Sequence, residues 1–277
     1  MTKSRHLIAL DLDGTLLTDD KVISERTKKT VLKAKDEGHI VVIATGRPHR
    51  ASIDYYRELG LDTPMVNFNG ALIHHPNDHK WDALHSPLPV RTALKIVDTC
   101  YTLGVRNVLA EVRDHIYIDR YDEELMEIFH ANTQDSIIKI GSLKTELDED
   151  PTSILIHPQE DHIQALRDHL DQEHASVIEH RKWGAPWNVI EIVRKGLSKA
   201  VGLEKIARYY NIPSNQIIAF GDEDNDLEMI EYAGVGVAMN NGIDELKKLA
   251  KHITASNEED GIGIFLEEYL NLNVHTN

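Results

Sequence analysis

Short, uninterrupted apolar runs alternate with helical segments at both ends of this 277-residue chain. Runs of this kind occupy residues 7–10, 40–44 and 65–68 near the N-terminus and residues 217–220 near the C-terminus. A strand that is apolar along its whole length suits a parallel sheet with helices packed on both faces. The alternation therefore predicts an α/β fold built on an open, doubly wound, Rossmann-like parallel sheet with right-handed crossovers.

The middle of the chain has a different pattern, in which short alternating strands and helices are mixed. Such a mixture is typical of an α+β unit with an antiparallel sheet. We therefore predict one core domain made of residues 1–83 and 189–277, interrupted by an inserted α+β domain of residues 84–188. The apolar run at residues 188–193 is expected to be the strand that re-enters the core.

Composition narrows the class of protein. Hydrophobic residues make up 41% of the chain and charged residues 27%, which is ordinary for a soluble globular protein, and no apolar run is long enough to span a membrane. The net charge of −16 argues against nucleic acid or an anionic membrane surface as the main partner. The short polar N-terminus leaves no room for a signal peptide, and the single cysteine, Cys100, cannot form an internal disulfide. These features predict a cytoplasmic protein.

Two aspartates follow the first apolar run. Asp11 and Asp13 leave the end of the predicted strand together, and Gly14 permits a sharp turn directly after them. Neighbouring carboxylates repel each other, so we expect a cation between them or a raised pKa on one of them. Because hard cations prefer carboxylate oxygen, the segment predicts a Mg²⁺ site with one aspartate free to attack an electrophile. A simple turn or capping pair is the alternative interpretation.

A second acidic cluster follows the apolar run at residues 217–220. Four acids and one amide, from Asp222 to Asp226, fill the turn before the next predicted helix. The helix dipole would explain one or two acids at this position, but four adjacent acids at the end of a buried strand favour a bound cation. Ligands of doubly wound sheets collect at the carboxyl ends of the strands, so the two clusters are expected to share one ion.

Two further segments can supply the groups that an anionic substrate needs. Thr45 and Gly46 precede Pro48, which suits a first helical turn, so we expect them at a helix N-terminus, a natural anion site. As a plain helix start this motif is common. Lys199 opens a predicted helix over residues 199–210. Most lysines are exposed, but a lysine at a helix start opposes the helix dipole and so indicates an anionic partner.

These four motifs, in this order and each after a strand, resemble those of the haloacid dehalogenase-like phosphohydrolase superfamily over essentially the whole chain. The insertion between the threonine and lysine motifs is similar to the α+β cap of the Cof-type subfamily (IIB, C2 cap), as are residues 67–73 and 234–241. The chain looks particularly like the bacillus-type members that dephosphorylate 5-amino-6-(5-phosphoribitylamino)uracil. The resemblance implies a Mg²⁺-dependent phosphatase.

The resemblance also implies a role for each motif residue. Asp11 is the nucleophile that forms an aspartyl-phosphate, and Asp13 protonates the leaving oxygen and then activates water. The Asp11 carboxylate, the Asp13 backbone carbonyl and Asp222 hold Mg²⁺, while Asp226 supports the ion through a water or from outside its coordination sphere. The residues expected to bind the phosphoryl oxygens are Thr45, Gly46, Lys199 and Asn225.

By the same resemblance, the inserted domain is a cap that closes over the site and reads the leaving group of a small phosphorylated metabolite. A sugar phosphate, FMN or a riboflavin-pathway phosphate would fit. Candidate readers are Arg181, Trp183 and Trp187, in the loop that returns to the core. An aromatic ring there could stack on a flat substrate, but the two tryptophans could equally pack inside the cap. The sequence does not predict an oligomeric state.

Two other functions are compatible with the same residues. A phosphosugar mutase would pass the phosphoryl group from Asp11 to a sugar hydroxyl instead of to water. A non-catalytic metabolite-binding protein would not need the nucleophile, so the presence of Asp11, Asp13, Lys199 and Asp222 argues against it. A dehalogenase would have no use for an acid-rich metal cluster.

Overall fold

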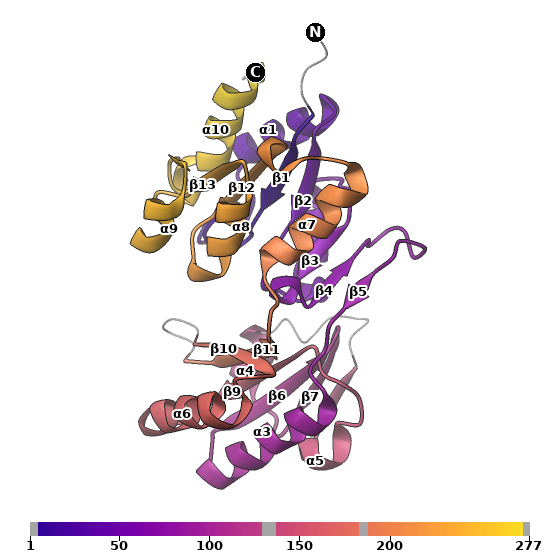
Figure 1. The fold of residues 1–277 in the computed structure, drawn as a ribbon, viewed down its shortest axis with the longest axis vertical. Coiled ribbons are helices and arrows are strands. Elements are labelled where there is room, and N and C mark those ends of the chain that lie inside the picture. The colour runs from indigo at the N-terminus through magenta and orange to yellow at the C-terminus, as the bar shows by residue number, and fades with distance from the viewer. Residues whose placement is uncertain (1–4, 129–136, 183–187, 274–277) are drawn as a thin grey trace. The chain divides into compact units, whose positions relative to one another are not determined.

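The computed structural model describes residues 5–128, 137–182 and 188–273. The contacts between its Cα atoms divide it into two compact units. The core unit comprises the residues up to Arg47, Ser52–Ala83 and the residues from Ser198 onward. The inserted unit comprises Leu84–Leu197 together with the short segment Pro48–Ala51 (Figure 1).

A five-stranded parallel sheet forms the centre of the core unit, in the order β14-β13-β12-β1-β2. The strands are β1 (Leu7–Leu10), β2 (Ile40–Ile43), β12 (Ile217–Gly221), β13 (Val235–Ala238) and β14 (His252–Ile253). In the register of the sheet, Leu10 lies opposite Ile43 on one side and opposite Phe220 on the other. Because these three strands are parallel, their carboxyl ends emerge at the same edge of the sheet.

Helices cover both faces of this sheet (Figure 1). They are α1 (Glu25–Asp36), α2 (Ile53–Glu58), α7 (Lys199–Tyr210), α8 (Leu227–Tyr232), α9 (Asp244–Leu249) and α10 (Gly261–Leu270). The doubly wound α/β core predicted from the sequence is therefore confirmed. None of the helices among the described residues combines the length and the apolar character that crossing a membrane requires.

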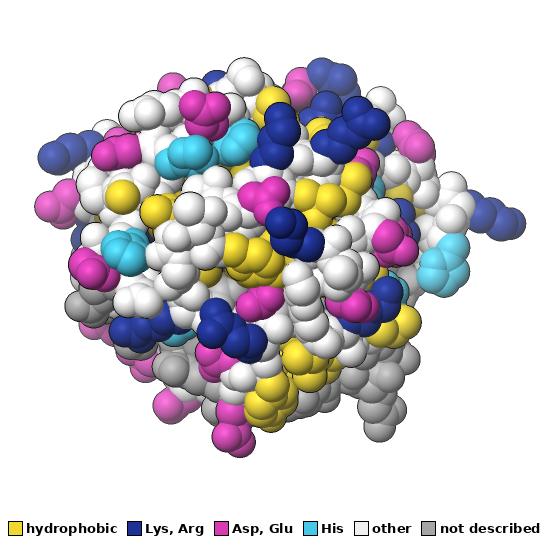
Figure 2. Space-filling view, turned by 90° about the horizontal axis from the view of Figure 1, so that it is seen from below, with side chains coloured by type: hydrophobic (Ala, Val, Ile, Leu, Met, Phe, Trp, Pro, Cys, Tyr) yellow, Lys and Arg dark blue, Asp and Glu magenta, His cyan; other side chains and the backbone are white. Residues whose placement is uncertain are grey.

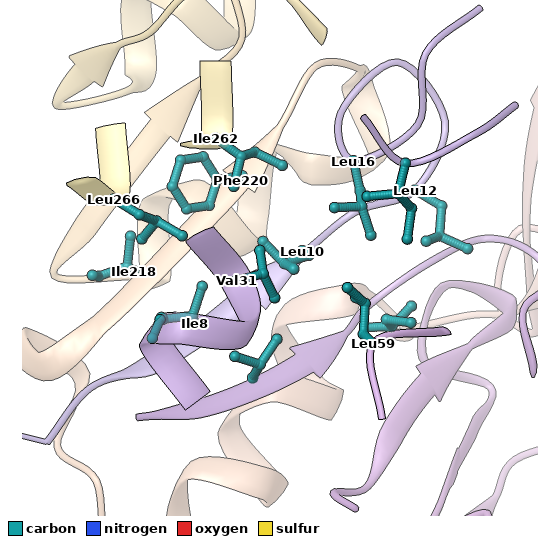
Figure 3. Packing of buried hydrophobic residues seen from close by; sticks show 14 of the residues in the cluster. Ile8, Leu10, Leu12, Leu16, Val31, Leu59, Ile218, Phe220, Ile262 and Leu266 are labelled. Atoms are coloured by element: carbon teal, nitrogen blue, oxygen red, sulfur yellow. The ribbon is translucent and has the colours of Figure 1, made fainter. Parts of the chain in front are cut away.

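Alternate residues of the strands build two apolar layers, because successive side chains point to opposite faces. On one face, Ile8 and Phe220 pack with Val31 of α1 and with Ile262 and Leu266 of α10 (Figure 3). The opposite face packs against α7, α8 and α9. Each fully buried leucine or isoleucine contributes about 2 kcal/mol relative to exposure, so the sheet and its edge are rigidly held.

One strand of the core unit departs from the parallel pattern. Strand β3 (Met65–Asn67) continues the sheet through a single parallel bridge between Ala44 and Val66. Its other edge pairs in antiparallel fashion with β4 (Leu72–His74). The run at residues 65–68 was expected to be a further strand of the parallel sheet. It does form a strand, but apart from the one bridge to Ala44 its pairing is the antiparallel hairpin with β4.

The inserted unit contains a six-stranded sheet in the order β10-β11-β9-β6-β7-β8, antiparallel except between β7 and β8. Its strands are β6 (Asn107–Val112), β7 (His115–Ile118), β8 (Ile138–Ile140), β9 (Ser153–His157), β10 (Ile178–Lys182) and β11 (Ile190–Arg194), and β5 (Leu84–His85) precedes them. Its helices are α3 (Val90–Leu103), α4 (Glu123–Ile128), α5 (Leu143–Glu146) and α6 (Ile163–His174). Cys100 of α3 is a buried free thiol in the apolar layer between the helices and the sheet.

Strand β11 belongs to this sheet, where it lies between β9 and β10. The sequence pattern assigned the run at residues 188–193 to the core, and that placement of the strand is wrong. Ile190 and Ile192 pack in the apolar layer of the inserted unit. The chain re-enters the core unit only at Ser198, immediately before α7.

A buried ion pair ties the segment Pro48–Ala51 into the inserted unit. The Arg50 guanidinium pairs with the Glu111 carboxylate of β6, and both side chains are almost fully buried. Ser153 of β9 donates to the other oxygen of Glu111 at 2.7 Å, and the Arg50 amide donates to Asp114 at 2.8 Å. Removing one partner of a buried ion pair leaves an uncompensated charge, so these contacts hold the segment firmly.

The acidic excess of the chain is not gathered on the face shown in Figure 2. Lysine and arginine side chains are interspersed there with acidic and hydrophobic ones. That face therefore presents no large field of one sign.

Candidate active site

Three polar residues lie at or just beyond the carboxyl ends of neighbouring parallel strands. Asp11 follows β1, Asp222 follows β12, and Thr45 lies two residues after β2. All three are buried. The parallel register brings them to one edge of the core sheet, as the strand-end argument predicted.

Asp11, Asp222 and Asp226 form a buried carboxylate cluster. One oxygen of each lies within 4.8 Å of those of the other two, which is the spacing of groups that share a metal ion. Lys199, the first residue of α7, is fully buried beside them. Three carboxylates and one ammonium leave a formal charge of −2 in a place shielded from water, so a divalent cation would neutralise the cluster.

Lys199 contacts two of these carboxylates. Its Nζ donates to Asp11 Oδ1 at 2.6 Å and to Asp226 Oδ1 at 2.7 Å. Burial opposes the charge on Lys199, but the two carboxylates outweigh it and raise the pKa above its ordinary value. The anionic partner that the helix-dipole argument required is thus present in the form of carboxylates.

The hydrogen bonds leave two carboxylate oxygens open. Asp226 uses both of its oxygens, because Oδ2 accepts the backbone amides of Asp222 and Glu223 at 3.1 and 3.2 Å. Asp222 Oδ1 accepts the Thr15 hydroxyl at 2.7 Å. Within the described part of the chain, Asp11 Oδ2 and Asp222 Oδ2 accept no hydrogen bond. These hard oxygen donors fit Mg²⁺ or a similar cation.

The pKa values of the cluster also favour a site for a cation. Burial holds the pKa of Asp11 well above its usual range, although Lys199 opposes this. Burial and the neighbouring Asp226 raise the pKa of Asp222 to about 7, despite the Thr15 hydrogen bond. A bound cation would reverse both shifts because it stabilises the ionised carboxylates.

Gly14 makes room for the cluster. Its φ is +72°, in the left-handed region, and a Cβ at this position would lie 2.2 Å from Asp222 Oδ2. Only glycine satisfies both requirements, so the turn after Asp13 is what allows Asp222 to approach Asp11.

Asp13 lies outside the carboxylate cluster, with a half-exposed side chain. Arg47 donates to both of its oxygens, through Nε to Oδ2 at 2.6 Å and through Nη2 to Oδ1 at 2.7 Å. Lys21 donates to Oδ1 at 2.9 Å. Burial works against ionisation, but the Arg47 and Lys21 contacts outweigh it and hold the pKa of Asp13 well below its usual range.

The threonine motif differs from the expected helix start. A short 3₁₀ turn, His49–Ala51, follows Pro48, and helix α2 begins only at Ile53. The prediction that Gly46 lies at the N-terminus of an α-helix is therefore wrong. An anion bound here would accept a hydrogen bond from the Gly46 amide without the dipole of a following α-helix. The Thr45 Oγ1 accepts the Arg47 amide at 3.1 Å, which leaves the hydroxyl hydrogen available for a ligand.

Asn225 and Asn69 meet beside this motif. Asn225 Nδ2 donates to Asn69 Oδ1 at 3.1 Å, while Asn225 Oδ1 is buried with no hydrogen-bond partner among the described residues. A buried polar atom without a partner usually marks a place for a ligand or water. Asn69 has a φ of +52° and would lie 3.2 Å from a Cβ at Gly46.

Sequence reasoning missed Arg47 and Lys21, and it placed Asn69 at a ligand-binding strand end without giving it a role. Asn69 carried a usable signal, because an Asn-Gly pair directly after an apolar run marks a turn at a strand end. Arg47 and Lys21 carried none, since their partner Asp13 is distant in sequence from Arg47 and separated from Lys21 by a loop.

The residues predicted to read the leaving group belong to the inserted unit. Arg181 lies on β10, opposite Glu191 of β11 in the register of that sheet. Trp183 and Trp187 fall outside the described residues.

Phosphoryl transfer needs a nucleophile and positive charge around the phosphoryl oxygens, and the carboxylates and the buried ammonium at this sheet edge suit that class of enzyme. The sequence profile of the haloacid dehalogenase-like hydrolases matches residues 8–266, and the chain belongs to this family. It is a phosphoric monoester hydrolase.

Known relatives cover nearly the whole chain. The 5-amino-6-(5-phospho-D-ribitylamino)uracil phosphatase YitU of Bacillus subtilis is 53% identical over 272 residues, which is 98% of this chain and 100% of the relative. The pyridoxal phosphate phosphatase YbhA of Escherichia coli is 29% identical and covers 96% of this chain and 98% of its own. The crystal structure of TM0651 from Thermotoga maritima superposes with a TM-score of 0.82 at 26% identity, over 99% of both chains.

Proposed function

We propose that Asp11 is the nucleophile of a Mg²⁺-dependent phosphatase that works through an aspartyl-phosphate. The observation that carries this proposal is the open Oδ2 of Asp11, held beside Lys199 and Asp222 at the edge of the sheet. A carboxylate whose other oxygen is fixed by a lysine presents its free oxygen in one direction, as in-line attack on phosphorus requires.

The proposed reaction has two steps, formation of the aspartyl-phosphate and its hydrolysis. An oxygen of Asp11 bonds to phosphorus while the bond from phosphorus to the alcohol oxygen breaks, and Asp13 gives a proton to that oxygen. The Asp13 carboxylate then takes a proton from water. The water oxygen bonds to phosphorus as the bond to Asp11 breaks, which releases inorganic phosphate and restores both aspartates.

The remaining residues neutralise and orient the phosphoryl group. Lys199 supplies a fixed positive charge, Thr45 a hydroxyl and Gly46 a backbone amide. A half-turn of both the Asn225 and the Asn69 amides, which would keep a hydrogen bond between them, would present the Asn225 NH₂ to a phosphoryl oxygen. Asp11, Asp222 and the Asp13 carbonyl would hold Mg²⁺, which when bound supplies positive charge for the phosphoryl oxygens. Asp226 holds Lys199 and the turn of Asp222 in place from outside that ion's coordination sphere.

The proposed substrate is 5-amino-6-(5-phospho-D-ribitylamino)uracil. It is supported by the name of the 53% identical relative from Bacillus subtilis. Pyridoxal phosphate, the substrate in the name of the Escherichia coli relative, is the first compound to compare with it. Leaving-group recognition by Arg181, Trp183 and Trp187 and a cytoplasmic location stay predictions.

Phosphate release from a panel of phosphorylated metabolites, with Mg²⁺ and with a chelator, tests the proposal. We expect release from the ribitylaminouracil phosphate in Mg²⁺, at least a tenfold lower kcat/KM for pyridoxal phosphate and for sugar phosphates, and no release with the chelator. Asp11→Asn is expected to lower kcat by at least about a thousandfold in a folded protein. Release that requires a sugar co-substrate would instead indicate a mutase, and binding without turnover a metabolite-binding protein.

A further inference from the structure

Lys21 lies in a tight turn that sets the direction of its side chain. Its backbone amide donates to the Thr18 carbonyl at 2.9 Å, and the Thr18 amide donates to the Val22 carbonyl at 3.0 Å. The φ of Lys21 is +60°, a conformation that side-chain-bearing residues rarely adopt. The Tyr55 hydroxyl of α2 donates to the Lys21 carbonyl at 3.0 Å and so fastens the turn to the core unit.

Two cationic side chains contact the Asp13 carboxylate, which is half-exposed, as is Lys21. Lys21 donates to Oδ1 at 2.9 Å, and Arg47 donates to both oxygens. The Arg47 guanidinium carbon lies 5.5 Å from the centre of the Tyr55 ring. Tyr55 thus contacts the guanidinium of Arg47 and the backbone carbonyl of Lys21, and all four residues belong to the core unit.

The two cations hold Asp13 in different ways. The fork of Arg47 donates one N–H to each oxygen, and Oδ2 accepts no other hydrogen bond among the described residues. Because a carboxylate oxygen has two lone pairs, Oδ2 keeps one for exchanging a proton with a substrate. Lys21 is a single-point contact to Oδ1. It can remain in place and keep the carboxylate oriented while Oδ2 exchanges the proton with the reacting oxygen.

We propose that Lys21 is a positioning residue for proton transfer by Asp13, and that the Tyr55 hydroxyl fixes the turn from which Lys21 acts. This inference rests on the proposed function, because it assigns a purpose to Lys21 only if Asp13 protonates the leaving oxygen. The loss of kcat/KM on removing Lys21 should then be larger for a leaving group that needs a proton more strongly. An alkyl alkoxide needs one, whereas 4-nitrophenolate departs without one.

The test compares kcat/KM for an alkyl phosphate and for 4-nitrophenyl phosphate, because this ratio reports the steps up to departure of the alcohol. For Lys21→Met we expect a loss of roughly tenfold with the alkyl ester, below the full contribution of a general acid, and of less than about threefold with the nitrophenyl ester. KM should change by less than about twofold with either ester. Lys21→Arg, which keeps a cation at this position, should recover most of the loss.

Lys28→Met is the matched control. Lys28 is also a partly exposed lysine of the core unit, and its Nζ lies 3.0 Å from Glu58 Oε1. We expect Lys28→Met to leave kcat/KM unchanged for both esters. Tyr55→Phe removes the hydroxyl that holds the Lys21 carbonyl and that also interacts with Arg47, and should show the same selectivity for the alkyl ester.

Equal losses with the two esters, or no loss with the alkyl ester, would overturn the role of Lys21. If Lys21→Met does not fold, Lys21→Gln, which also removes the ammonium, takes its place: a selective loss supports the proposal, and an unselective one contradicts it. Failure of the wild-type enzyme to release phosphate from either ester would contradict the proposed function itself, independently of Lys21.

Discussion

At the residue scale, the site depends on one ammonium group enclosed by carboxylates. Lys199 is fully buried and makes two short contacts, to Asp11 and to Asp226. An exposed ion pair contributes at most about 1 kcal/mol, but the loss of one partner from a buried set leaves charges that neither water nor protein compensates.

Lys199→Met is therefore expected to lower the free energy of unfolding of the core unit by about 3–5 kcal/mol in the absence of metal, and to abolish phosphate release. Urea denaturation monitored by circular dichroism measures the first effect. Lys33→Met, which removes an exposed contact of 3.5 Å to Glu37, should cost less than about 0.5 kcal/mol. A cost for Lys199→Met as small as that of the control would show that the cluster does not need this charge.

The residues whose meeting could be predicted from the sequence are those that follow strands directly. Asp11 and Asp222 could be predicted to meet, because a parallel sheet brings the ends of neighbouring strands to one edge whatever their separation in sequence. Lys21 could not be predicted in the same way, and the contact partner of Asn69 could not be predicted although its place at a strand end was. Lys21 reaches Asp13 from a turn whose left-handed residue leaves no sequence pattern, and Asn69 meets Asn225 only through tertiary packing.

At the element scale, the turn after β1 carries the strictest steric requirement in the site. Gly14 combines a left-handed backbone with a 2.2 Å approach between a would-be Cβ and Asp222. The backbone and the side-chain parts of that requirement can be separated, because Gly38, after α1, is also left-handed but has no heavy atom within 4 Å of its would-be Cβ.

We expect Gly38→Ala to cost about 1 kcal/mol from backbone strain and to leave kcat/KM unchanged. Gly14→Ala should cost about 1–3 kcal/mol more, and should lower kcat/KM by at least about tenfold because Asp222 must move. Thermal melts and phosphate-release rates of the two variants give the comparison. Equal activity in both would mean that Asp222 can be displaced without harm.

A second element-scale prediction concerns β5 of the inserted unit. Burial, reinforced by the nearby charge of Arg113, lowers the pKa of His85 to about 4, and its Nε2 lies 2.9 Å from the Thr152 hydroxyl. The unfolded chain binds this proton near pH 6.5, so the neutral histidine stabilises the fold fully above that pH, and the stabilisation is lost as the pH falls towards 4.

Between pH 7 and pH 5, the wild-type protein should therefore lose on the order of 1 kcal/mol more unfolding free energy than His85→Gln, after allowance for partial exposure. Denaturant titrations at the two pH values measure this difference. The exposed His252 provides the control, since His252→Gln should follow the wild-type pH dependence. Parallel pH curves for wild type and His85→Gln would contradict the prediction.

The elements themselves were well predicted where the pattern was local. Helix α7 (Lys199–Tyr210) has the predicted bounds, because its apolar spacing and end signals lie within the segment. Strand β11 was placed in the wrong sheet. An apolar run reveals a strand, but its pairing partner is decided by distant strands, here β9 and β10.

At the scale of the whole molecule, where the net charge is −16, added salt can stabilise the fold in two ways. Any salt screens the repulsion among surplus carboxylates and so stabilises the fold. A divalent ion that binds the carboxylate cluster of Asp11, Asp222 and Asp226 adds a stabilisation that grows with its concentration relative to its dissociation constant.

We therefore expect MgCl₂ to raise the melting temperature above that in NaCl of the same ionic strength. At a concentration a hundred times its dissociation constant, the extra stabilisation is about 2.7 kcal/mol. Asp222→Asn should lose this extra shift and keep the response to NaCl. Thermal denaturation without substrate is the measurement, so the result is independent of turnover. Identical melting temperatures in the two salts would show that the cluster does not bind the ion.

The buried partnership of Arg50 and Glu111 has a consequence for trimming the polypeptide. Joining Ala83 directly to Ser198 would delete Leu84–Leu197, which is nearly all of the inserted unit. The segment Pro48–Ala51 would remain, without the residues that it contacts in that unit. The stranded guanidinium would have lost its counter-charge. A minimal version of this phosphatase therefore has to be redesigned at Arg50 as well as at the two splice points.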